Sequence, residues 1–141
     1  MIKHTGAAIT TLMILVCGVA MAETTASKES AAIAAAEAWL KLVDEGKYMD
    51  SWRQAAEYLK AAVKPDQWEQ SMRAFRQPLG GTVSRTLKSK NYATSLPGAP
   101  DGEYVVIQYE TSFENKKSTI ETITPVVEKD GMWRVSGYYI K

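Results

Sequence analysis

Apolar residues are spaced three and four apart between residues 31 and 75, which is the period of an amphipathic helix. The first run covers residues 31–43 and is followed by Gly46, a residue suited to the left-handed conformation that often ends a helix. A second run over residues 48–63 predicts a second helix, and therefore a helical hairpin. A third, shorter helix is expected from Pro65, because proline fits the first helical turn. Its apolar stripe is Trp68, Met72 and Phe75.

Beyond Gly80-Gly81 the apolar period changes from 3.6 to two, which is typical of strands. We expect four strands, at residues 82–92, 103–113, 118–128 and 133–140. Hairpin turns are expected at residues 115–117 and at Asp130-Gly131, where Asp-Gly accepts the positive φ angles of a tight turn. Pro125 cannot donate to a strand ladder, so the third strand either lies at an edge or carries a bulge there.

Helices followed by an antiparallel meander predict an α+β fold, with the helices packed on one face of a four-stranded antiparallel sheet. We expect one domain over residues 31–141, preceded by a short flexible lead at residues 23–30, which are small and polar. The tryptophans lie on apolar stripes and are expected in the core. They are Trp39, Trp52, Trp68 and Trp133.

Residues 1–22 have the organisation of a secretory signal peptide. Lys3 supplies the positive start, residues 7–19 carry no charge, and Ala20-Met21-Ala22 matches the small-x-small cleavage pattern. Cleavage is therefore expected between Ala22 and Glu23. A membrane anchor is the alternative, but the apolar run is shorter than the roughly 18–20 residues that span a bilayer. We expect a periplasmic or secreted protein with no stable membrane anchor after cleavage.

Removal of this signal peptide, the leader, changes which charged and reactive side chains the mature protein contains. The chain has 17 Lys and Arg, 16 Asp and Glu, one histidine and one cysteine. Lys3, His4 and Cys17 all lie in the leader, which leaves a net charge of zero and neither histidine nor cysteine. A neutral chain lacks the basic footprint of a nucleic-acid-binding protein. The commonest nucleophiles, bases and metal ligands are absent too, so we expect no metal, no other cofactor and no nucleic-acid partner.

Three segments resemble a catalogued bacterial family. They are AEAWL at residues 36–40 with the following Gly46, Tyr48 and Ser51-Trp52, SLPGAPDGEYVVIQYETSFENK at residues 95–116, and GMWRVSGYYIK at residues 131–141. Together they are similar to domain of unknown function 4019, over about residues 31–141. This resemblance implies a small exported bacterial protein and carries no assigned activity. The order of elements also resembles the nuclear transport factor 2-like or cystatin-like cone, a likeness of fold alone.

A twisted sheet covered by helices predicts a concave cavity, and pockets combine aromatic walls with few polar groups. The candidate ligand-binding residues are Tyr48, Trp52, Arg85, Tyr109 and Trp133. Arg85 would orient an anionic ligand, since its guanidinium fork matches a carboxylate or phosphate. The alternative is that these side chains fill the core and that Arg85 forms a surface ion pair.

We expect a non-enzymatic domain that binds a small molecule or a peptide in this cavity, with a homodimer left open. No catalytic residue is assigned. One alternative is a small enzyme based on carboxylates or tyrosines, in which Glu110 and Glu121 lie opposite each other on neighbouring strands. A buried carboxylate beside a buried tyrosine would favour it. Another alternative is an envelope adaptor that uses the sheet face or the loop at residues 97–102.

Overall fold

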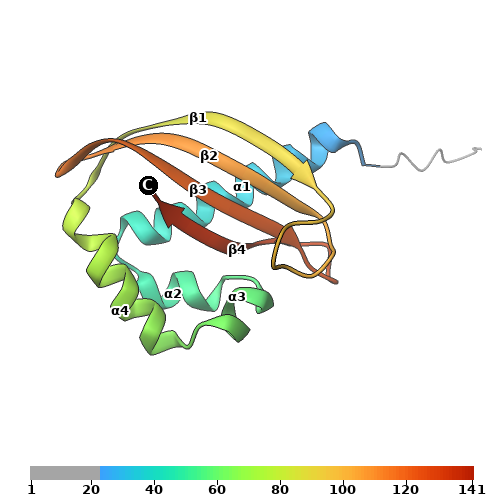
Figure 1. Cartoon of the computed structure of the whole chain (residues 1–141), viewed down its shortest axis with the longest axis horizontal. Coiled ribbons are helices and arrows are strands. Elements are labelled where there is room, and N and C mark those ends of the chain that lie inside the picture. Colours follow the sequence, from blue (N-terminus) through green and yellow to red (C-terminus); the bar gives the residue numbers. More distant parts are fainter. Residues whose placement is uncertain (1–22) are drawn as a thin grey trace, which may run out of the picture.

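A computed structural model describes residues 23–141 of the chain (Figure 1). The predicted signal peptide and its cleavage at Ala22 lie outside the described residues. Within residues 23–141, no helix is both long and apolar enough to cross a membrane.

The first half of the domain consists of helices. They are α1 (Thr25–Asp44), α2 (Tyr48–Arg53), α3 (Glu57–Ala62), α4 (Pro65–Phe75) and the short 3-10 helix η1 (Gln77–Leu79). The predicted start at Pro65 is confirmed, and so is the turn at Gly46, whose φ is +74°.

The predicted flexible lead over residues 23–30 is wrong, because α1 begins at Thr25. The Thr24 hydroxyl accepts the Ser27 N–H at 3.1 Å and caps the helix. The Lys28 ammonium donates to the Glu103 carboxylate at 2.5 Å, which fixes this first turn to the sheet. Capping and a tertiary ion pair thus order a segment that carries no apolar stripe.

The predicted second helix over residues 48–63 is divided into α2 and α3. The break falls at Ala56, whose N–H donates to the carbonyl of Val135 on strand β4 (Trp133–Ile140) at 2.8 Å instead of to a helical carbonyl. Ala55 and Ala56 are fully buried, so the chain lies close against the strand at this point. The apolar spacing continues across the break, which is why the sequence period does not reveal it.

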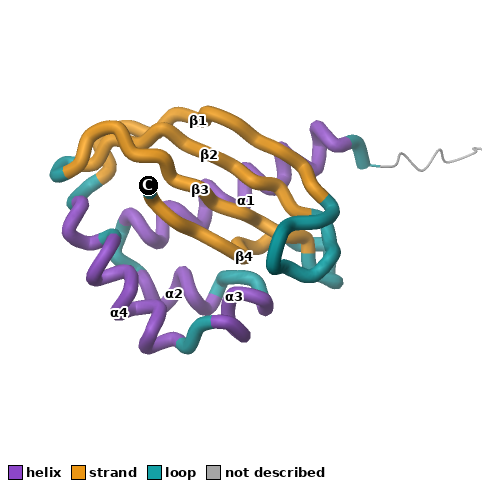
Figure 2. The backbone as a smooth tube through the Cα atoms, viewed as in Figure 1, coloured by secondary structure: helices purple, strands orange, loops and turns teal. Residues whose placement is uncertain are grey.

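The second half is a four-stranded antiparallel sheet in the order β1-β2-β3-β4 (Figure 2). Its strands are β1 (Thr82–Ala93), β2 (Tyr104–Phe113), β3 (Lys116–Val127) and β4 (Trp133–Ile140). The α+β class and the four antiparallel strands are confirmed, while the likeness to a cone remains a prediction. Pro125 lies in an interior strand, at a register shift between β3 and β4, so the bulge is the correct alternative.

The prediction that Glu110 and Glu121 oppose each other is wrong. Phe113 pairs with Lys116, so the turn between β2 and β3 begins one residue earlier than expected, and a register shift precedes it. Glu121 therefore lies opposite Tyr109, on the face that the helices cover, whereas Glu110 is exposed. A one-residue change of register moves a side chain to the other face of a sheet.

The core lies between α1 and the sheet, since α1 contacts all four strands and crosses behind them in Figure 1. Ala32 and Ala36 bring the helix close, and Leu40 packs over the buried aliphatic residues of the strands. Trp39 and Trp68 are buried as expected, while Trp52 and Trp133 are half-buried against the same core. Helix α4 packs instead on α2 and η1, beside the free edge of β4.

Candidate functional site

The five predicted site residues do not converge on one cavity. Tyr48 is buried and lines a hollow of about 230 Å³ at the end of α1, whereas Trp133 lines a separate hollow of about 460 Å³. Tyr109 belongs to the core. Trp52 is half-buried and donates its indole N–H to the carbonyl of Val63 at 2.8 Å.

Arg85 is held by two carboxylates of the protein itself. It donates to both oxygens of Asp44, at 2.7 and 2.9 Å, and to both oxygens of Glu121, at 2.8 and 3.2 Å. Both forks of the guanidinium are therefore engaged by ion pairs instead of a ligand. These ion pairs are largely buried, so the expected surface location is wrong. Arg85 faces inward because it lies opposite Thr111, a buried position of β2.

Glu121 is the centre of this arrangement, and its side chain is 0% exposed. Besides Arg85, it accepts the Thr111 hydroxyl at 2.5 Å and the hydroxyl of Tyr138 from β4. Three strands therefore supply donors to one carboxylate. A buried charge persists only where such partners replace water.

A second guanidinium completes a four-charge cluster formed by Asp44, Arg76, Arg85 and Glu121. Arg76 donates to Asp44 at 3.3 Å and to the carbonyl of Gly80 at 2.6 Å. Its guanidinium carbon lies 4.4 Å from the centre of the Phe113 ring. With two acids and two bases, the four-charge cluster is formally neutral. The Arg76 Nε–H is buried and has no hydrogen-bond partner among residues 23–141.

The surroundings shift the pKa values of several members. Burial works against the charge of Asp44, but hydrogen bonds from Arg85 hold the pKa of Asp44 below its usual value. Burial likewise opposes the charge of Arg85, yet its bonds to Asp44 and Glu121 raise the pKa of that guanidinium. Burial, followed by the charge of Glu121, raises the pKa of Tyr138 well above its usual value. Tyr138 therefore remains a hydrogen-bond donor at neutral pH.

A buried carboxylate beside a buried tyrosine is the feature expected of an enzyme. Glu121 and Tyr138 are such a pair of residue types. Glu121, however, is inaccessible and already accepts bonds from Arg85, Thr111 and Tyr138. Burial raises the pKa of Tyr109 to about 12, so this tyrosine also stays neutral. Within residues 23–141, no three His, Cys, Asp or Glu residues gather as metal ligands. The ion pairs of the four-charge cluster join α1 to β1 and β1 to β3.

The loop predicted for partner contact is tied to the domain. The Tyr58 hydroxyl donates to the carbonyl of Gly98 at 2.9 Å, and the Tyr104 hydroxyl donates to the carbonyl of Pro100 at 2.6 Å. The same loop borders an open, charged hollow whose Arg134 is paired with Glu128 and Asp130. The two tyrosine hydrogen bonds hold the loop against the domain. In the hollow, the Arg134 guanidinium already pairs with two carboxylates of the protein.

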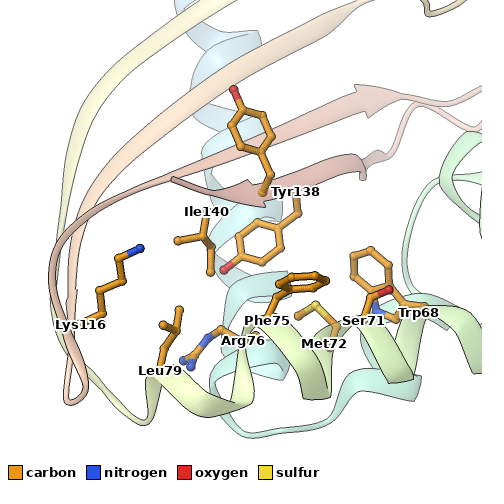
Figure 3. A pocket seen from close by; sticks show the side chains of 10 residues that line it. Trp68, Ser71, Met72, Phe75, Arg76, Leu79, Lys116, Tyr138 and Ile140 are labelled. Carbon is orange, nitrogen blue, oxygen red and sulfur yellow. The ribbon is translucent and has the colours of Figure 1, made fainter.

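A mostly apolar site lies outside the predicted cavity. It is a groove of about 320 Å³ between α4–η1 and the C-terminal half of β4, which we call the α4–β4 groove (Figure 3). Trp68, Met72 and Phe75 line it from α4, and Tyr138 and Ile140 line it from β4. Phe75 is 77% exposed, although the sequence placed it on the same stripe as two buried residues.

One end of the α4–β4 groove is basic. Figure 3 shows Arg76, Leu79 and Lys116 together at this end, away from Trp68. Lys116 forms no ion pair with any residue of the described part of the chain. The groove therefore combines an apolar body with cationic side chains at one end. Sequence reasoning did not find it, because α4 and β4 are brought side by side only by the tertiary fold.

Comparison with known proteins places the chain in a family. No curated protein matches the sequence. A family match does extend over residues 35–138, which covers the second half of α1, the other helices, β1 to β3 and β4 as far as residue 138. The chain therefore belongs to the family described as Protein of unknown function (DUF4019).

Proposed function

We propose that this protein is an exported, non-enzymatic binding domain whose site is the α4–β4 groove. Its ligand is an amphipathic anion, a molecule with an apolar body and a carboxylate or similar group at one end. The observation that carries this proposal is the apolar groove closed at one end by Lys116 and Arg76. This site replaces the predicted cavity between the helices and the concave face of the sheet, where the core side chains pack.

The size and exposure of the groove support ligand binding. A volume of about 320 Å³ suits a small ligand. Phe75 lines the groove and is 77% exposed, so the free protein presents a large aromatic surface to water there. Covering one such side chain contributes about 1.5–3 kcal/mol, which gives an apolar ligand its driving force.

The charges favour an anion at the basic end. The four-charge cluster is neutral by itself, so Lys116 adds an unbalanced positive charge. The Arg76 guanidinium borders the same end, but it is buried and paired with Asp44, so Lys116 is the charge that an anion in the groove can reach.

The apolar part of the site is tested with 1-anilinonaphthalene-8-sulfonate, a fluorescent aromatic anion. We expect saturable fluorescence enhancement with the folded protein. Phe75→Ser should weaken binding about tenfold or more, because it removes roughly 2 kcal/mol of apolar contact. Met132→Ser is the matched control, since Met132 is exposed but lies outside the groove.

The charged end is tested with a second matched pair. Lys116→Gln should weaken binding of the same probe severalfold, whereas Lys117→Gln should not, because Lys117 does not line the groove. Circular dichroism and melting temperature, which report folding, should stay unchanged in both variants. Absence of saturable binding to the wild-type protein, or equal losses at Lys116 and Lys117, contradicts the proposed function.

Export is the second part of the proposal, supported by the arrangement of Lys3, the uncharged run and Ala20-Met21-Ala22. N-terminal sequencing of protein from intact bacterial cells should begin at or within a few residues of Glu23. Ala22→Arg should block processing because the cleavage site accepts small residues, and Ala22→Gly should preserve it. Recovery of membrane-embedded protein that starts at Met1 would exclude cleavage.

A further inference from the structure

Strand β4 has unpaired backbone groups along the α4–β4 groove. Lys141 exchanges two hydrogen bonds with Ile120, at 3.0 and 2.9 Å, and Ile140 lies opposite Glu121. In an antiparallel pair, bonded and non-bonded residues alternate, so Tyr138 and Ile140 direct their N–H and C=O groups away from β3. Among residues 23–141, no backbone group pairs with them on that side.

The two edges of the sheet differ in how they are protected. Natural sheets protect their edges with charges, bulges or covering elements. Strand β1 carries Arg85, Lys88 and Lys90 and has two register shifts against β2. Strand β4 carries no charged residue over residues 135–140. On its outer edge, the one backbone hydrogen bond within residues 23–141 is from the Ala56 N–H to the Val135 carbonyl. The edge beside the groove is therefore open to pairing.

We infer that the α4–β4 groove binds an extended peptide, which adds to the β4 edge as a fifth strand. This inference rests on the proposed function and names the class of its ligand. Backbone bonds to Tyr138 and Ile140 supply affinity, and alternate apolar side chains of the peptide pack on Met72 and Phe75. An acidic group of the peptide lies beside Lys116.

Charge complementarity selects a peptide partner over a second copy of this chain. Strand β4 itself has no acidic residue. The acidic residues that precede β4, Glu128 and Asp130, already pair with Arg134, so a second copy that paired through its own β4 would bring no free carboxylate to Lys116. A short acidic peptide can pair with the free backbone groups of β4, cover the apolar wall of the groove and place a carboxylate beside Lys116.

The probe is a capped six-residue peptide of alternating valine and threonine that ends in glutamate. Two comparison peptides carry N-methyl groups on one or the other alternate set of amides. We expect the unmodified peptide to slow amide hydrogen exchange at Tyr138 and Ile140 at least tenfold, measured by nuclear magnetic resonance. One N-methylated peptide should bind at least tenfold more weakly, because its strand-facing donors are removed, and the other should bind nearly unchanged.

The charge contact is measured on the same peptide. Lys116→Gln should weaken binding of the glutamate peptide but not of its glutamine analogue, and Lys117→Gln should affect neither. Retained binding of 1-anilinonaphthalene-8-sulfonate with no protection of Tyr138 and Ile140 by the peptide overturns this inference and leaves the proposed function standing. Failure of both ligands overturns both. A dimer in light scattering, with these two amides protected before peptide is added, identifies a second copy as the occupant and overturns the peptide.

Discussion

Replacing Arg85 by methionine should lower the free energy of unfolding by about 3–5 kcal/mol, which is a large part of the stability of a domain of this size. The substitution leaves the carboxylate of Glu121 buried without its cation and removes the main partner of Asp44. Breaking a buried ion pair on one side costs more than the pair contributes, because the remaining charge has lost its water. Urea denaturation followed by tryptophan fluorescence measures the change.

Arg134→Met is the matched control for this prediction. Arg134 also contacts two carboxylates, those of Glu128 and Asp130, but this cluster lies at the surface. Its loss should cost no more than about 1 kcal/mol, since water screens and replaces surface ion pairs. A double variant, Arg85→Met with Glu121→Leu, should recover part of the lost stability by removing the orphaned charge. Equal losses for Arg85→Met and Arg134→Met would show that the four-charge cluster does not stabilise the fold.

The sequence predicts most of the elements, because their signals are local. The strand at residues 133–140 has the predicted bounds, and the helix that starts at Pro65 begins at the residue indicated by the proline. The predicted helix bounds are wrong where a tertiary contact overrides the helical spacing of apolar residues. The Ala56 N–H bonds to β4 and divides one predicted helix, and Thr24 and Lys28 order a segment without an apolar stripe.

The site is less predictable than the fold for a related reason. The sequence indicates Arg85 as the charge that would orient an anionic ligand, but its actual partner Glu121 depends on the register of the β2–β3 hairpin. A two-residue turn and a register shift decide which glutamate faces the core, and composition does not encode either. Phe75 is a second example, because its place on the apolar stripe of the helix does not reveal that its side chain stays exposed in the folded protein. Only the path of α4 beside β4 turns that stripe into one wall of a groove.

Trp39 links the core to the groove, and Trp39→Ala should cost about 3–5 kcal/mol of unfolding free energy. Trp39 is 3% exposed and donates its indole N–H to the carbonyl of Ser51 at 2.8 Å. Its ring centre lies 6.0 Å from that of Trp68 and 5.2 Å, edge-on, from that of Tyr138. Removing the ring therefore creates a cavity directly behind two side chains that line the α4–β4 groove.

Trp133→Ala is the control, because Trp133 is half-buried and lies outside the groove. It should cost clearly less stability than Trp39→Ala in the same urea titration, since less apolar surface leaves water when this ring packs. Binding of 1-anilinonaphthalene-8-sulfonate, measured where each variant is still folded, should weaken for Trp39→Ala and stay unchanged for Trp133→Ala. The reason is that the Trp39 ring contacts both Trp68 and Tyr138, which line the groove from α4 and β4. If Trp39→Ala lost stability while its groove affinity stayed at the wild-type level, the groove walls would be positioned independently of the core.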